Sequence, residues 1–269
     1  MNGNNLTFKA ILTACLIIGS ATFITAQTVT VDNYFNNEMH KDQAGKEAKF
    51  HYLWNDDANT GFSKLGEAFT NHGSAVLKTL TEKPTIANLK GTAIYIIADP
   101  DNLGDNPHPN YMDKAAAKSI SKWVKAGGVL FLLANDQKNC DLGHFNILAE
   151  KFGLHFNKDL ILHVVDDNHF GDGGINTSTT PMFKTAKEIF IKDACSISID
   201  KNAKAVLKDK NGADVLVYTH YGKGTVLAVG DPWLYNEYTN GRLPSKYEND
   251  KAANDIAAWL LHRVRGLKW

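Results

Sequence analysis

The chain has 269 residues, and its 29 basic and 29 acidic side chains give a formal net charge of zero at pH 7. Because nucleic-acid binding needs a basic face and the lysines here are spread along the chain, the composition argues against a nucleic-acid partner. No linker-like stretch interrupts residues 27–269. We therefore expect one domain, large enough for a sizeable core, over that range.

Residues 1–26 have the features of a secretory signal peptide. Lys9 precedes an apolar segment, 10–24, that is too short to span a bilayer and is followed by small residues. We expect cleavage after Ala26, a periplasmic protein, and no membrane association once the leader is removed. A lipoprotein signal is the alternative, because residues 12–15 resemble a lipobox, but few apolar residues precede it.

The first half of the chain alternates between apolar runs and amphipathic segments. Non-alternating apolar runs are typical of strands that are covered on both faces, and a 3.6-residue apolar period is typical of helices. Strands are expected at Val29–Phe35, Ala75–Leu80, Ala93–Ala98 and Val129–Ala134. Helices are expected at Ser63–Asn71, between Tyr111 and Gly127, and from His144 to Gly153.

The second half is less regular up to about residue 196. It then contains two strand patterns, Val206–Lys208 and Asp214–Thr219, with a hairpin turn at Lys210–Gly212. A buried strand, Thr225–Val229, and a helix, Asp250–Val264, follow. These elements predict an α/β fold with a doubly wound, mostly parallel sheet, glutamine amidotransferase-like or flavodoxin-like, and antiparallel edge strands near the C-terminus.

Three of the expected parallel strands end in polar clusters. These are Asp99–Asp101, Asn135–Asp136, and Asp231–Trp233 with Tyr235, Asn236, Glu237 and Tyr238 behind it. Ligands bind at the carboxyl ends of such strands, so we expect the clusters to converge on one site. Each cluster alone is also explained by strand termination and helix capping. Caps do not explain the aromatic residues of the third cluster, which suit sugar rings.

Several chemistries lack their motifs in this chain. There is no G-x-S-x-G elbow, no Walker loop and no G-x-G-x-x-G after the first strand. No zinc or calcium spacing occurs, so no metal or other cofactor is expected, although Asp99, Asp101, Asp136 and His144 are an alternative metal site. Cys140 lies in a loop without a nucleophile turn, which argues against amidotransferase activity. Cys140 and Cys195 either pair or remain free thiols.

Several segments together resemble a known family. They are His51–Trp54, Gly61–Ser63, Tyr95–Asp101, Trp123–Gly128, Asn135–Asp136, His144–Asn146 and Gly230–Tyr238. They are similar to the amidotransferase-like domain attached to unsaturated rhamnogalacturonyl hydrolases of polysaccharide-degrading bacteria. The helical barrel of the hydrolase itself has no counterpart in this sequence, so glycosidase activity of that kind is not expected.

Stand-alone chains of this group resemble an oligosaccharide dehydratase of ulvan breakdown. The resemblance implies removal of water from a non-reducing-end glucuronic or iduronic acid linked to sulfated rhamnose, which yields the 4,5-unsaturated uronate that the hydrolases need. The implied partner is an oligosaccharide with a terminal uronic acid, with no obligate protein partner. The alternative is a non-catalytic carbohydrate-binding accessory module.

The implied reaction sets the roles to be filled. A base must take the C5 proton, an acid must assist the departing 4-hydroxyl, and the substrate carboxylate must be neutralised. For proton transfer we assign His144 as base and Tyr235 as acid, with His51 and Tyr238 as alternates. Candidates for gripping the carboxylate are Asn135, Asn236 and Arg242. Candidates for stacking on the sugar are Trp54 and Trp233, and those for binding hydroxyls or orienting a histidine are Asp99, Asp101, Asp136, Asp231 and Glu237.

Overall fold

A computed structural model describes residues 26–41, 44–73, 75–266 and 269. The expected signal peptide therefore lies outside the described residues, apart from its last position. Within the described part of the chain, no helix is long and apolar enough to cross a membrane.

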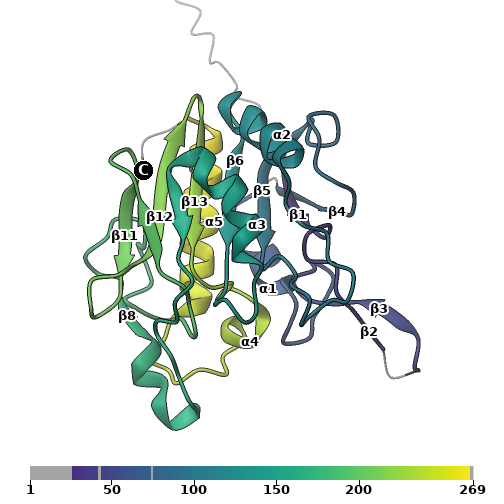
Figure 1. The fold of residues 1–269 in the computed structure, drawn as a ribbon. Coiled ribbons are helices and arrows are strands. Elements are labelled where there is room, and N and C mark those ends of the chain that lie inside the picture. The colour runs from purple at the N-terminus through teal and green to yellow at the C-terminus, as the bar shows by residue number, and fades with distance from the viewer. Residues whose placement is uncertain (1–25, 42–43, 74, 267–268) are drawn as a thin grey trace, which may run out of the picture.

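The fold is built on a seven-stranded central sheet with the order β11-β12-β13-β6-β5-β1-β4 (Figure 1). Strands β4, β1, β5, β6 and β13 pair in parallel, whereas β12 and β11 are antiparallel additions at one edge. The expected mostly parallel α/β sheet with antiparallel strands near the C-terminus is thereby confirmed. The strands are β1 (Gln27–Asp32), β4 (Ala75–Leu80), β5 (Thr92–Ala98), β6 (Val129–Leu133), β11 (Lys204–Lys208), β12 (Asp214–Tyr221) and β13 (Gly224–Val229).

Helices cover both faces of this sheet. In Figure 1, α2 and α3 lie in front of the sheet and α5 lies behind it. Successive residues of each central strand point to opposite faces of the sheet and belong to two separate apolar clusters. One cluster packs with α1 and α5, and the other packs with α2 and α3. The helices are α1 (Ser63–Asn71), α2 (Lys114–Lys125), α3 (Leu142–Ala149), α4 (Asn236–Thr239) and α5 (Asn249–Val264).

Short elements occupy the stretches that the sequence left irregular. Three two-stranded pairs are β2 (Met39–Lys41) with β3 (Glu47–Lys49), β7 (Leu154–Phe156) with β10 (Ile197–Ile199), and β8 (Gly174–Asn176) with β9 (Glu188–Phe190). Two 3-10 segments are η1 (Glu150–Phe152) and η2 (Asp167–Gly173). Strands of three residues are too short to establish an apolar period, which is why the sequence did not predict them.

The ends of β5, β6 and β13 lie level with one another. Ala98 pairs with Leu133, and Leu133 pairs with Val229 on its other side. The Asp99 amide then donates to the Leu133 carbonyl at 2.8 Å. The three polar segments that follow these strands therefore start in one row at the carboxyl edge of the sheet, as expected for convergence on one place.

Candidate functional site

Asp99 lies at the centre of the carboxyl edge. Its side chain is buried, and Oδ2 accepts hydrogen bonds from the Tyr52 hydroxyl at 2.9 Å and from Asn135 Nδ2 at 3.1 Å. Its other oxygen, Oδ1, has no hydrogen-bond partner in the structure. Burial raises the pKa of Asp99 well above its usual range, and the nearby Asp105 and Glu38 carboxylates raise it further.

The loop before α1 brings His51 and Tyr52 to this acid. The Tyr52 amide donates to the Thr60 carbonyl at 2.9 Å, which closes the loop on itself. His51 and Tyr52 have left-handed backbone, with φ of 60° and 54°, and Asp99 has φ of 46°. Left-handed backbone costs energy in residues with a Cβ atom, and such positions cluster at functional sites. Three such residues in contact therefore mark this edge as a site candidate.

A row of four rings runs along the same edge, and we call it the aromatic row: His51, Tyr52, Tyr235 and Tyr238. Neighbouring ring centroids are 5.1 Å, 5.9 Å and 5.0 Å apart in that order. His51 Nδ1 is 2.8 Å from Glu38 Oε1. A carboxylate at Nδ1 holds the proton there and leaves Nε2 as the nitrogen that accepts a proton. The row combines this acid–histidine pair with three phenols.

Asp231 is the second buried acid of this edge. Its Oδ2 has no hydrogen-bond partner among the described residues. Burial together with the charge of Asp99 raises its pKa well above its usual range. Burial and Asp231 in turn raise the pKa of Tyr235, which stays a protonated phenol at neutral pH. The charged groups that raise the pKa of Asp99 and Asp231 are carboxylates. Burial and these neighbouring carboxylates therefore both oppose the charged form of Asp99 and of Asp231.

Asn236 ties the end of β13 to the loop before α1. Its Nδ2 donates to the carbonyls of Asp56 and Ala58, at 2.9 Å and 2.8 Å, and to Ser63 Oγ at 3.0 Å. Its Oδ1 accepts from the Lys64 amide at 3.0 Å. The side chain is buried and its hydrogen-bonding groups are used within the protein. The prediction that Asn236 grips a substrate carboxylate is therefore wrong, and it instead positions Tyr235 beside Tyr52.

The side chains of Asn135 and Asp136 also form their hydrogen bonds within the protein. Asn135 Nδ2 donates to Asp99, and its Oδ1 accepts from the Asp136 amide at 2.8 Å. Asp136 accepts from the Lys138 amide and from Asn139 Nδ2, at 2.7 Å and 2.6 Å. These bonds are those of a loop cap, the alternative that the sequence had left open. Asn135 therefore orients Asp99, and Asp136 shapes the turn after β6.

Asp101 resembles Asp99 in its burial and its raised pKa, and it resembles Asp136 in its hydrogen bonds to loop residues. It is buried, and its Oδ2 accepts from the Asn37 amide at 3.0 Å and from Asn106 Nδ2 at 2.7 Å. Its Oδ1 has no hydrogen-bond partner within the part of the chain that the structure describes. Burial raises its pKa to about 6. Asp101 thus holds the loops that follow β1 and β5 together.

Arg242 and Glu237 lie at the open end of the aromatic row. Arg242 Nη1 is 3.0 Å from Glu237 Oε1, and Nη2 is 3.0 Å from the exposed Asp167 carboxylate. The guanidinium carbon lies 5.9 Å from the Tyr238 ring centroid. Exposed ion pairs of this kind contribute little free energy, on the order of 1 kcal/mol or less. Arg242 can therefore exchange Asp167 for another carboxylate at low cost.

The two tryptophans do not form sugar platforms. Trp233 is fully buried and belongs to the apolar cluster on the α1–α5 side, where its ring lies 6.3 Å from that of Phe183. Trp54 packs at the edge of the same cluster near Phe69, and its indole nitrogen donates to the Lys78 carbonyl at 2.8 Å. The predicted stacking of Trp233 on a sugar is wrong, and Trp54 is likewise occupied by packing.

His144 lies apart from the aromatic row. Its Nδ1 is 2.6 Å from Asp141 Oδ2, and its ring stacks on Tyr111 with centroids 4.4 Å apart. Asp141 caps α3 and donates its amide to the Pro100 carbonyl, on the α2–α3 side of the sheet. No contact of His144 within the described residues reaches Asp99 or Tyr235. The structure therefore does not bring His144 to the aromatic row, whereas His51, the alternate candidate, belongs to it.

The described residues contain no group of three or more His, Cys, Asp or Glu side chains arranged to hold a metal ion. The alternative metal site at Asp99, Asp101, Asp136 and His144 is thus not assembled. Cys140 and Cys195 are both buried free thiols, and burial raises the pKa of each thiol well above its usual range. Neither has the lowered pKa of a nucleophilic thiolate.

The residues that sequence reasoning missed are Tyr52 and Glu38. Tyr52 lies inside the His51–Trp54 segment, from which the sequence analysis selected only His51 and Trp54 as candidate site residues. Glu38 stood in a polar stretch with no pattern around it. Tyr52 contacts Asp99 from left-handed backbone, and no periodicity in the sequence reports that conformation.

No family model and no curated protein sequence matches the chain. Solved structures with a similar fold include the mmIFT52 N-terminal domain, with a TM-score of 0.65 and 16% identity over 87% of this chain and 97% of that one. A cytoplasmic protein from Salmonella typhimurium LT2 has a TM-score of 0.55 and 13% identity over 90% of this chain and 100% of that one. A β-galactosidase from Bacillus circulans sp. alkalophilus has a TM-score of 0.52 and 14% identity over 90% of this chain and 31% of that one. At such identities these likenesses describe the fold alone.

Proposed function

We propose that the protein is an oligosaccharide dehydratase that removes water from a non-reducing-end uronic acid linked to rhamnose, as in ulvan. The proposal starts from the sequence resemblance to the amidotransferase-like group. The observation that carries it is the aromatic row, in which an acid–histidine pair and three phenols lie beside Asp99 at the carboxyl edge of the sheet. The fold, by the same resemblance, is of the glutamine amidotransferase-like kind without the amidotransferase cysteine.

His51 and Tyr235 have the chemistry for the two proton transfers. With Glu38 at Nδ1, the Nε2 atom of His51 accepts the C5 proton of the uronate. Tyr235 stays protonated because burial and Asp231 raise its pKa, so it donates to the departing 4-hydroxyl. Tyr52 and Asp99 hold the row together between these two groups. His51 and Tyr235 were both among the candidates for proton transfer from sequence.

Arg242 is the group that neutralises the substrate carboxylate in this proposal. The C5 proton is acidic enough to remove only when that carboxylate is paired or tightly hydrogen-bonded. Arg242 lies beside Tyr238 and pairs with an exposed partner, Asp167. The substrate carboxylate takes the place of Asp167 at Nη2, while Nη1 keeps its ion pair with Glu237.

The deciding experiment incubates the purified protein with saturated uronic acid–rhamnose oligosaccharides. The expected product has a conjugated, 4,5-unsaturated uronate, which is followed by its ultraviolet absorbance, and a mass lower by one water. The matched variants are His51→Ala, which removes the base, and His144→Ala, a histidine outside the row. Absence of both signals from every uronic acid substrate overturns the proposal.

The rival function is a non-catalytic carbohydrate-binding module. It draws on the occurrence of a similar fold within a longer β-galactosidase chain, of which this chain covers 31%. A stacking module needs exposed aromatic faces, whereas Trp233 is fully buried and Trp54 is partly buried against the same apolar cluster. Sugar binding without any absorbance or mass change identifies the module.

We also propose a periplasmic location, on the basis of the leader sequence.

A further inference from the structure

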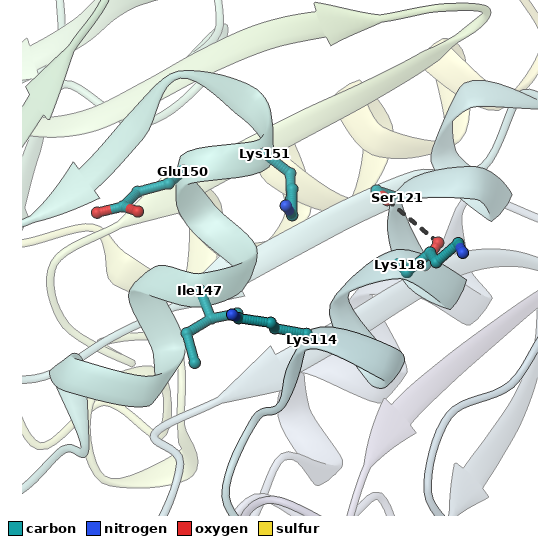
Figure 2. A pocket seen from close by; sticks show the side chains of 6 residues that line it. All are labelled: Lys114, Lys118, Ser121, Ile147, Glu150 and Lys151. Carbon is teal, nitrogen blue, oxygen red and sulfur yellow. Dashed lines mark hydrogen bonds between the residues drawn. The ribbon is translucent and has the colours of Figure 1, made fainter.

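A groove on the other side of the sheet is separate from the aromatic row. It lies between α2 and α3, encloses about 660 Å³, and is shown in Figure 2. We call it the lysine groove, because three of its lining residues are lysines. The lining residues are Lys114, Lys118, Ser121, Ile147, Glu150 and Lys151.

The charge of this groove is strongly biased. Lys114 and Lys118 are one helical turn apart on α2, and Lys151 lines the opposite side of the groove from η1, directly after α3. Within the described part of the chain, no ion pair involves any of these three ammonium groups. The carboxylate of Glu150 pairs with His155 at 2.9 Å and points away from the lysines in Figure 2. The groove therefore presents three unpaired cations.

An aromatic pair adjoins this basic surface. His144 lies one helical turn before Ile147 on α3, and its ring stacks on that of Tyr111, which lies in the loop just before α2. Both side chains are more than a third exposed, at 37% for the Tyr111 residue and 48% for the His144 side chain. The sequence had selected His144 as a functional residue, and the structure places it here.

We propose that the lysine groove, together with the Tyr111–His144 pair, binds an anionic polysaccharide chain through its repeated sulfate or carboxylate groups. Three cations along two helices match a ligand that carries several anions, and an exposed ring pair suits a sugar. Duplex nucleic acid also carries repeated anions, and its binding is one of the outcomes tested below. The choice of a glycan rests on the proposed dehydratase function.

The test compares the binding of dextran sulfate, polygalacturonate and neutral dextran to the full chain at low salt. The variant Lys114→Glu/Lys118→Glu/Lys151→Glu reverses the groove, and Lys90→Glu/Lys158→Glu/Lys201→Glu makes the same charge change at exposed lysines elsewhere. Because released counterions drive polyanion binding, we expect the groove variant to bind the anionic polymers at least about tenfold more weakly and with a shallower salt dependence. The control variant should stay within about twofold of the wild type.

Further arms separate the possible ligands. Tyr111→Ala should weaken binding of the anionic glycans without changing its salt dependence, since it removes an uncharged contact. Equal weakening by both lysine variants, or equal binding of neutral dextran, overturns the proposal. If inorganic sulfate displaces the glycans much better than chloride does at the same ionic strength, the groove is a site for a single anion. If duplex DNA binds more tightly than both anionic glycans, the groove is a nucleic-acid surface. Either result also overturns it.

This test stands apart from that of the dehydratase. The groove variant keeps the whole aromatic row, so it should turn over short uronic acid oligosaccharides at the wild-type rate. If no substrate is ever dehydrated but dextran sulfate binding still depends on the three lysines, the dehydratase fails and the anion-binding groove stands. Dehydration without lysine-dependent binding supports the dehydratase and overturns the groove.

Discussion

The carboxyl edge of the sheet and the lysine groove differ in whether their charged side chains are buried or exposed. At the edge, Asp99 and Asp231 are buried, each has one carboxyl oxygen without a hydrogen-bond partner among the described residues, and burial raises the pKa of both. In the groove, three lysines line an open surface and form no ion pair within the described residues. Burial without a countercharge tunes protonation, which is what proton transfer needs. Exposure keeps a full charge available, which is what recognition of a polyanion needs.

The largest expected effect separates the two histidines. His51→Ala should lower the rate of dehydration by on the order of 10²–10⁴, the usual contribution of a positioned general base. His144→Ala, which alters the groove side, should leave turnover of short oligosaccharides within about twofold. The measurement is kcat from the ultraviolet absorbance of the product. Equal losses in both variants erase the distinction between the edge and the groove.

The next effect concerns the core beneath the edge. Trp233→Ala should lower the free energy of unfolding by about 3–5 kcal/mol, because a fully buried indole leaves a cavity. Urea denaturation followed by circular dichroism measures it. The matched control is Tyr111→Ala, since Tyr111 is 37% exposed and should cost far less. A small loss at Trp233 means that its ring is accessible after all.

A third effect is a dependence of stability on pH that comes from Asp32, the buried acid at the end of β1. Burial raises its pKa to about 6 from 3.8, against the opposing hydrogen bonds from Tyr95, Tyr34 and Phe35. Below about pH 4 the carboxyl is protonated in both the folded and the unfolded chain. Between about pH 4 and 6 the unfolded chain loses the proton first, so the free energy of unfolding should fall by about 3 kcal/mol as pH rises.

Asp32→Asn tests this assignment, because the amide has a similar shape and no titration in that range. Urea denaturation at pH 4, 5, 6 and 7 should show a smaller decrease for the variant than for the wild type. Parallel curves for the two proteins assign the decrease to other acids, such as Asp101.

The smallest effect belongs to the groove. Reversing Lys114, Lys118 and Lys151 should change the free energy of unfolding by less than about 1 kcal/mol, because exposed and unpaired charges contribute little to stability. The same denaturation series measures it. A loss of several kcal/mol shows that these lysines support the fold, and the contrast with the buried edge then disappears.

Much of the fold was predictable from local pattern. The bounds of α1 and β4 agree with the sequence prediction, and β5, β6 and β13 differ by one residue at an end, because apolar runs without alternation identify buried strands. The convergence of their polar ends followed from parallel pairing alone. The three-residue strands were not predictable, since they are held by long-range pairing and not by a period of their own.

The position of the candidate site was predictable from the sequence, but several of the residues predicted to form it do not belong to it. His51, Tyr235 and Tyr238 meet in one row, as candidates from separate stretches of the sequence. Trp233 follows an Asp-Pro pair and therefore looked exposed. The tight turn in which the Leu234 amide donates to the Pro232 carbonyl accompanies an indole that is buried in the core. Whether an aromatic residue at a strand end faces water or core depends on such a turn.

The Asn236 side chain has a consequence for the order in which the protein assembles. Its hydrogen bonds join positions that are 172 to 180 residues apart in the chain. Closing so long a loop is slow, because its entropic cost precedes any gain from the contacts. The loop that carries His51 can therefore reach its final place only after the segment that carries Tyr235 has emerged and docked. We therefore expect the carboxyl edge to be one of the last parts of the molecule to form.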